Sequence, residues 1–142
     1  MKTKPDNEQF QYWLAHMDDT LDAFVASAPE PIRPQLDGSP QSLDALETWL
    51  LSRYASIADA KKSSEAQFID GAARYVGEIF RERTGSKWML ENRDPKFVFF
   101  GRPILHGGAF GRMTECPMSL VTASLDRRTG RYLSTILANF ST

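Results

Sequence analysis

The segment of residues 64–90 constrains the fold more than any other part of this chain. Apolar residues recur there at the three- and four-residue spacing of a helix face, and the spacing stops where a glycine follows two arginines. The pattern predicts a central packing helix over residues 64–84, followed by a strand centred on Trp88. Gly71 and Gly77 lie inside this helix, where glycine costs about 1 kcal/mol relative to alanine. We therefore expect another element to cross the helix closely.

The remaining apolar spacing, together with the placement of proline and glycine, predicts further helices and a hairpin. The helices are expected at about residues 6–26, 40–57, 117–127 and 131–140. The hairpin is expected at about residues 87–101, with strands at 87–90 and 96–100, and residues 102–105 are a candidate third strand. This order predicts an α+β fold. It would be a mostly helical single domain, residues 1–142, with a small antiparallel sheet of two or three strands between N-terminal and C-terminal helices.

Cysteine content and hydropathy indicate the compartment. Cys116 is the only cysteine, so no disulfide within the chain is expected, and the first residues lack the apolar segment of a secretory signal. No apolar run approaches the roughly 18 residues that are needed to cross a bilayer. These features predict a cytoplasmic protein without a membrane partner.

Charge is divided unevenly along the chain, although the formal net charge is only -1. Residues 1–70 hold 6 basic and 12 acidic residues, a net charge of -6, whereas residues 71–142 hold 11 and 6, a net charge of +5. Most basic residues of the second half are arginines, whose planar guanidinium suits carboxylates and phosphates. The small net charge and the acidic first half argue against nucleic acid as a partner.

The sequence contains no complete signature for catalysis or for a bound metal or cofactor. Cys-x-x-Cys, His-x-x-x-His and calcium-loop spacings are absent, so we expect no metal and no cofactor. As a nucleophile, Cys116 would need His106 or His16 as its base, and such isolated residues are more often structural. The glycine-rich loop at 106–112 lacks the lysine and hydroxyl residue of a P-loop. We predict that the protein is not an enzyme.

The middle of the central helix carries a string that resembles a known group of proteins. It reads Gly71-Ala72-Ala73-Arg74-Tyr75-Val76-Gly77-Glu78, and it is followed by Gly85 and by Trp88 in a strand. The pattern resembles small uncharacterised bacterial proteins in which a helix with a Tyr-Val-Gly-Glu-like core leads into a tryptophan-bearing hairpin. Some members of such families are encoded beside secreted polymorphic toxins and act as their immunity proteins. The resemblance covers residues 64–137 and implies a stoichiometric inhibitor that blocks a toxin with a complementary surface.

An acidic surface on the first half of the chain would suit such an inhibitor, because it could occupy a basic cleft of the toxin. The residues that we predict to bind this protein partner are Asp18, Asp19, Asp22, Asp44 and Glu47. The alternative is a regulatory domain that binds an anionic small molecule or an acidic peptide through the arginine-rich half. The residues predicted for that site are Arg102, Gly107, Gly108, Arg112, Arg127 and Arg128.

Overall fold

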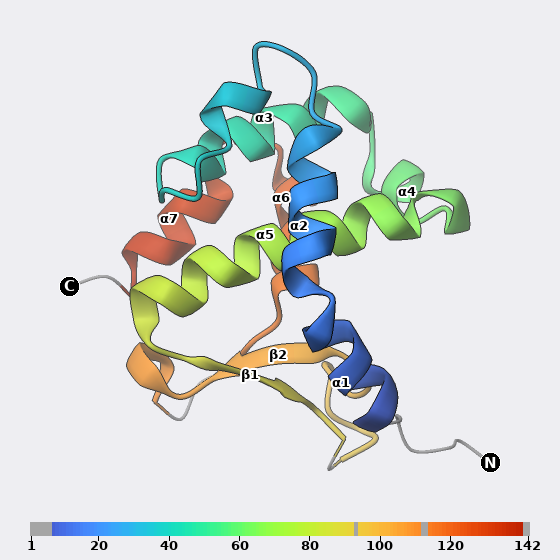
Figure 1. Cartoon of the computed structure of the whole chain (residues 1–142), viewed down its shortest axis with the longest axis vertical. Helices are drawn as coiled ribbons and strands as arrows, with labels where there is room; N and C mark the ends of the chain where they lie inside the picture. Colours follow the sequence, from blue (N-terminus) through green and yellow to red (C-terminus); the bar gives the residue numbers. More distant parts are fainter. Residues whose placement is uncertain (1–6, 93, 112–113, 141–142) are drawn as a thin grey trace.

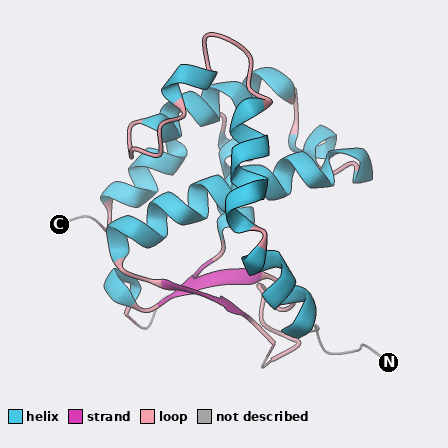
Figure 2. Cartoon of the chain, in the orientation of Figure 1, coloured by secondary structure: helices cyan, strands magenta, loops and turns pink. Residues whose placement is uncertain are grey.

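The computed structural model describes residues 7–92, 94–111 and 114–140. It confirms the predicted α+β architecture, a mostly helical fold with a small antiparallel sheet (Figure 1 and Figure 2). The α-helices are α1 (Asn7–Ala15), α2 (Met17–Ala26), α3 (Ser42–Arg53), α4 (Ile57–Ala60), α5 (Ala66–Thr84), α6 (Pro117–Arg127) and α7 (Tyr132–Ala138). The 3-10 helices are η1 (Arg33–Gln35), η2 (Ser63–Glu65) and η3 (Gly108–Phe110). The strands are β1 (Lys87–Leu90), β2 (Pro103–His106) and β3 (Thr114–Glu115).

Helix α5 lies at the centre of the molecule, as its apolar spacing predicts. It packs against α6 on one side, and α2 crosses over its other side (Figure 1). The sheet lies at the end of the molecule where α1 also lies (Figure 1). Helices α3, α5, α6 and α7 and strand β2 supply the largest fully buried apolar side chains, among them Leu43, Leu46, Leu50, Val76, Phe80, Ile104, Leu105, Val121, Leu125 and Leu133.

The two glycines inside α5 each make room for an aromatic ring. A Cβ atom added to Gly71 would lie 2.5 Å from Cδ1 of Phe24, which belongs to α2. A Cβ atom added to Gly77 would overlap the ring of Trp88, which belongs to β1. The predicted close crossing is therefore confirmed at both glycines, and it fixes where α2 and the sheet meet the central helix.

The single helix predicted over residues 6–26 is wrong, because the structure divides it into α1 and α2 at His16. The carbonyl oxygen of Trp13 accepts a hydrogen bond from Nη1 of Arg74 at 2.7 Å. His16 has φ −98° and ψ 14°, outside the range of an α-helix, so the helix is interrupted at this residue. A contact with α5 thus overrides a continuous apolar stripe.

The helix predicted over residues 40–57 is also too long, because α3 ends at Arg53 and Tyr54 is extended. The Tyr54 hydroxyl donates to Glu65, and the Tyr54 carbonyl oxygen accepts from Nη1 of Arg128 at 3.0 Å. These bonds turn the chain into α4, whose first residue is Ile57. By contrast, the bounds predicted for the helix over residues 117–127 coincide with α6.

The strand predicted over residues 96–100 is wrong. The partner of β1 is β2, whose residues overlap those of the candidate third strand over 102–105. Trp88 pairs with Leu105 in an antiparallel register. Residues 95–100 form turns instead, and β3 pairs with the other edge of β2. Ile104 and Leu105 are fully buried, whereas Val98 is 76% exposed. The segment that pairs with β1 is therefore the one whose apolar side chains lie in the core.

Candidate functional site

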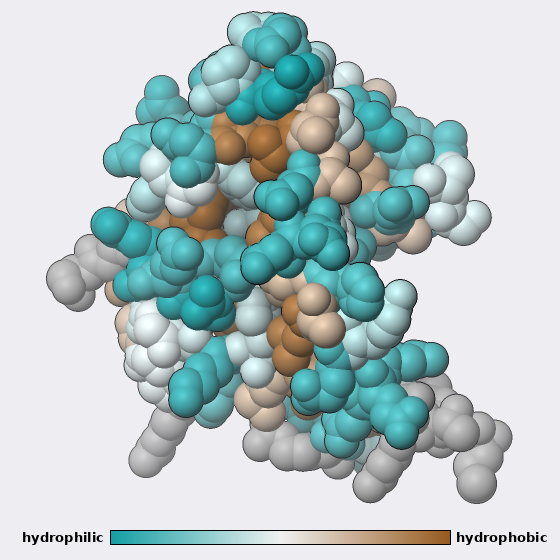
Figure 3. All heavy atoms as spheres, viewed as in Figure 1, coloured by the Kyte–Doolittle hydropathy of each residue, from teal (hydrophilic) through white to brown (hydrophobic). Residues whose placement is uncertain are grey.

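The crossing of α2 over α5 leaves one groove on each side of α2. The groove beside the C-terminal half of α5, which we call the acidic groove, has a volume of about 290 Å³. It is lined by Asp18, Leu21, Asp22, Val25, Leu36, Gly38, Tyr75, Glu78, Ile79 and Glu82. Figure 3 shows apolar surface in brown to the left of α2, above the hydrophilic C-terminal half of α5. The acidic groove therefore joins an apolar floor to four carboxylates.

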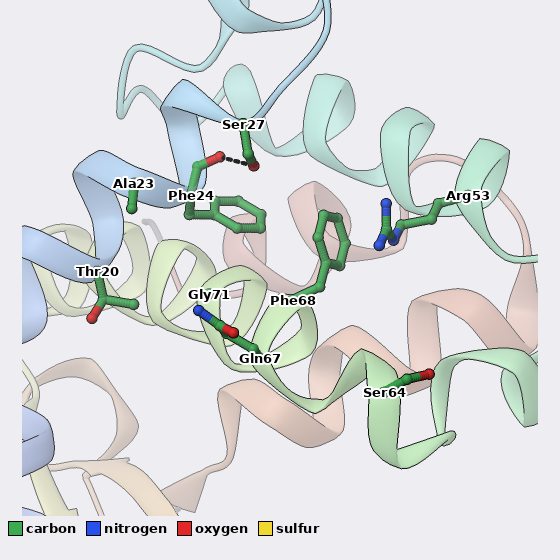
Figure 4. A pocket seen from close by; sticks show the side chains of 9 residues that line it. All are labelled: Thr20, Ala23, Phe24, Ser27, Arg53, Ser64, Gln67, Phe68 and Gly71. Carbon is green, nitrogen blue, oxygen red and sulfur yellow. Dashed lines mark hydrogen bonds between the residues drawn. The ribbon is translucent and has the colours of Figure 1, made fainter.

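The second groove lies beside the N-terminal half of α5, and we call it the aromatic groove. It also has a volume of about 290 Å³. Figure 4 shows its lining residues, with the rings of Phe24 and Phe68 next to each other and Arg53 beyond them. The Arg53 guanidinium lies 4.1 Å from the centre of the Phe68 ring, and its Nε lies 3.0 Å from a Glu65 carboxylate oxygen. The described residues that line this groove include no acidic side chain.

A buried polar cluster holds the C-terminal end of α1 in place on α5. Arg74 is 5% exposed, and its Nε lies 2.8 Å from an Asp70 carboxylate oxygen. The Arg74 guanidinium lies 4.1 Å from the centre of the Trp13 ring. The indole nitrogen of Trp13 donates to the other carboxylate oxygen of Asp70 at 2.8 Å. Because the buried Arg74 guanidinium has these partners, the cluster anchors the end of α1 on α5, and Nη1 of Arg74 also lies 4.0 Å from Sδ of Met17, the first residue of α2.

The far end of the acidic groove is fixed by Tyr75. Its hydroxyl donates to Oγ of Ser42 at 2.7 Å and accepts from the amide of Gly38 at 3.0 Å. Burial raises the pKa of this hydroxyl, so it stays protonated at neutral pH and keeps both bonds. The loop that contains Leu36 and Gly38 is thereby held against α5, which closes the groove opposite α2.

The predicted acidic residues of α2 remain exposed and unpaired. Asp18, Asp19 and Asp22 are exposed, and within the described residues they make no ion pair or side-chain hydrogen bond. Asp18 and Asp19 lie in the first turn of α2, where carboxylates favour the helix dipole. Asp22 lies beyond that turn, so its charge has no such local role.

Two carboxylates from α5 complete the groove, and the sequence interpretation did not place them there. Glu78 lies 2.6 Å from Nε of Arg81 and also accepts a hydrogen bond from the indole nitrogen of Trp88 at 3.0 Å. Glu82 is exposed and lies one turn further along α5. The four-residue spacing from Glu78 to Glu82 matches that from Asp18 to Asp22, and this shared spacing was the signal that could have joined the two pairs.

The other two residues of the predicted acidic surface lie elsewhere. Glu47 is fully buried, so it does not belong to an exposed surface. Its two carboxylate oxygens accept from the amides of Tyr132 and Leu133 at 3.1 and 2.9 Å, and they thereby cap the start of α7. Asp44 is exposed, and it accepts a hydrogen bond from Oγ of Ser134 at 2.7 Å. Both residues connect α3 to α7.

The structure does not bring the arginine-rich alternative set together. Arg102 donates to Oγ of Ser119, near the start of α6. Arg128 follows the other end of α6, where its guanidinium donates to the carbonyl oxygens of Leu51 and Tyr54. Its neighbour Arg127 lies over the ring of Tyr132. Arg102 therefore lies near the start of α6, whereas Arg127 and Arg128 lie at its other end, so these arginines do not form one site.

The glycines of that alternative set have a structural role. A Cβ atom added to Gly108 would overlap the backbone carbonyl oxygen of Thr84, so the loop packs tightly against the end of α5. Both Gly107 and Gly108 have positive φ values, 85° and 57°. Arg112 lies outside the described residues.

The thiol and the histidines show no catalytic arrangement within the part of the chain that the structure describes. Cys116 is fully buried at the start of α6. His106 lies in β2, and its buried Nδ1 atom makes no hydrogen bond to the described residues. His16 bonds the carbonyl oxygen of Tyr12 instead.

The described residues also show no group of three or more His, Cys, Asp or Glu side chains that could hold a metal ion. None of the described helices combines the length and the apolar character that crossing a membrane requires.

Comparison with models of known protein families, with curated proteins and with solved structures found no match. The resemblance to immunity proteins therefore stays a prediction from the sequence pattern.

Proposed function

We propose that the protein is a non-catalytic, cytoplasmic protein-binding domain, specifically an immunity-type inhibitor that blocks the basic cleft of a bacterial toxin. One observation carries the proposal: Asp18, Asp19 and Asp22 are exposed and make no ion pair with any described residue. Carboxylates without an internal partner are free to pair with cations of another protein. Their helix already packs on α5 through Phe24, which lies against Gly71, so binding orders little further chain.

The charge distribution supports the same function. The ion pairs of Glu30 with Arg33 and of Asp59 with Lys62 each lie inside the acidic half of the chain. They leave the acidic charge of α2 without compensation. An uncompensated acidic surface attracts a basic partner over about one Debye length, roughly 8 Å at physiological ionic strength. It would accelerate association and exclude acidic competitors.

Co-expression tests this proposal. The protein is expressed in bacterial cells together with each protein encoded beside it in its genome of origin. We expect one of these neighbours to stop growth when expressed alone, and the wild-type chain to restore growth. The triple variant Asp18→Lys, Asp19→Lys, Asp22→Lys should fail to restore growth, because like charges would then face the basic cleft.

The control is a triple variant with the same change in net charge, Glu30→Lys, Asp59→Lys, Asp126→Lys, which alters acids outside the acidic groove and should restore growth. Thermal unfolding followed by circular dichroism establishes that both triple variants are folded. If no neighbouring protein is toxic, or none is neutralised by the wild-type chain, the immunity function is wrong. If the α2 variant protects as well as the wild type, the α2 surface is not the binding site.

A further inference from the structure

We propose that the acidic groove receives one long basic side chain of the partner protein, with its aliphatic stem on the groove floor and its cationic head between the carboxylates of α2 and α5. The inference rests on the proposed function and deepens it, because it names the chemistry that the groove recognises. It also extends the binding site beyond α2 to Glu78 and Glu82, on a helix that the sequence interpretation did not assign to partner binding.

The groove has the shape and lining for such a side chain. Its volume of about 290 Å³ lies at the lower end of the range for ligand sites, which suits one or two side chains better than a whole helix. Leu21, Val25 and Ile79 line it together with Leu36. Lysine and arginine cover apolar surface with their methylene stems while their heads remain charged.

The carboxylates are arranged for a cation between two walls. Asp18 and Asp22 come from α2, and Glu78 and Glu82 come from α5, each pair four residues apart. Residues at this spacing lie on the same face of their helix. Arg81 partly neutralises Glu78, whereas Asp18, Asp22 and Glu82 have no ion pair among the described residues. These three carboxylates therefore lie along the groove without an internal cation, although they do not gather closely enough to enclose a metal ion.

The position of Glu82 is unfavourable for the helix itself. It lies in the last turn of α5, where a carboxylate opposes the helix dipole by about 0.3–1 kcal/mol. Its neighbours Arg81 and Arg83 have the favourable charge for that turn. Arg81 interacts favourably with Glu82, so what Glu82 adds to the groove is an exposed carboxylate that no ion pair among the described residues holds.

The aromatic groove provides an internal comparison. It has the same volume and shares α2 and α5 as walls, but the one charged side chain among its described lining residues is the cationic Arg53, which pairs with Glu65. An alkylammonium ion should therefore choose the acidic groove, although both grooves offer apolar surface. This contrast separates recognition of the cation from simple burial of an alkyl chain.

The test is a titration of the ¹⁵N-labelled protein with hexylammonium, which carries a cationic head on an aliphatic stem, followed by amide NMR shifts. We expect saturable shifts at residues 18–25 and 75–82, and none of that size at residues 64–71. Uncharged 1-hexanol should not give this pattern.

The variant Asp22→Asn, Glu82→Gln should bind hexylammonium at least about fivefold more weakly, because two charge pairs are lost. The control variant Glu30→Gln, Asp126→Asn should bind as the wild type does.

Three results would overturn the inference: hexylammonium shifts spread over all exposed acids, hexanol shifts equal to those of hexylammonium, or unchanged binding by the Asp22→Asn, Glu82→Gln variant. This outcome is separable from that of the proposed function. If the chain neutralises a neighbouring toxin but the groove ignores hexylammonium, only the inference fails. If the groove binds hexylammonium as expected but no neighbour is neutralised, the proposed immunity function fails and the cation specificity of the groove stands.

Discussion

Glu47 shows how far the identity of a single residue can mislead. In the sequence it is one more carboxylate in an acidic stretch, although its spacing from Leu43 and Leu50 places it on the apolar face of the predicted helix, where it is fully buried. Its partners, the amides of Tyr132 and Leu133, lie 85 and 86 positions further along the chain. A contact across such a separation depends on how α3 and α7 pack, which local spacing does not encode.

Replacing Glu47 should therefore destabilise the fold. Glu47→Ala removes both acceptors and leaves two amides unsatisfied at the start of α7, so we expect a loss of about 2–4 kcal/mol in the free energy of unfolding. Glu47→Gln retains one carbonyl acceptor and should lose about half as much. Urea denaturation measures both changes, and Asp44→Asn on the exposed side of α3 serves as the control, with a loss below about 0.5 kcal/mol. A Glu47→Ala protein as stable as this control would contradict the capping role.

Among the elements, those determined by local spacing were predicted well and those determined by distant contacts were not. Pro117 opens α6 and a glycine follows α5, so the bounds of these helices are visible in the sequence. The break at His16 depends on Arg74, and the choice of β2 over residues 96–100 depends on which segment reaches the core. Neither the helix break nor the choice of strand can be recognised from the residues next to it in the sequence.

The close crossing of α2 and α5 leads to a prediction at Gly71. Alanine favours a helix by about 1 kcal/mol over glycine, but the added methyl would overlap the Phe24 ring. Because overpacking outweighs propensity here, Gly71→Ala should lower the free energy of unfolding by about 1–3 kcal/mol.

A double-mutant cycle tests the cause of that loss. The smaller side chain of Phe24→Leu should relieve part of the overlap, so the double variant should lose less stability than the two single changes together. If the two losses in the free energy of unfolding simply add, or if Gly71→Ala stabilises the protein, the packing of the Phe24 ring does not require a glycine at position 71.

At the scale of the whole molecule, part of the uneven acidic charge of the sequence is gathered in the acidic groove. The sequence analysis selected Asp18 and Asp22, which line the acidic groove, but it did not predict the groove itself. The groove exists because α2 crosses α5, and that crossing brings Glu82 of the basic half of the chain beside acids of the first half. A separate analysis of each helix face cannot reveal this combination.

The central claim is that exposed carboxylates around α2 draw a basic protein to this molecule. The most direct measurement is the association rate constant, by stopped-flow fluorescence, between the chain and the neighbouring toxin that it neutralises, at low and at physiological salt. The wild-type rate should fall steeply with salt, and the Asp18→Lys, Asp19→Lys, Asp22→Lys variant should associate at least about tenfold more slowly at low salt. Equal association rates for the wild type and this variant at low salt would contradict the account.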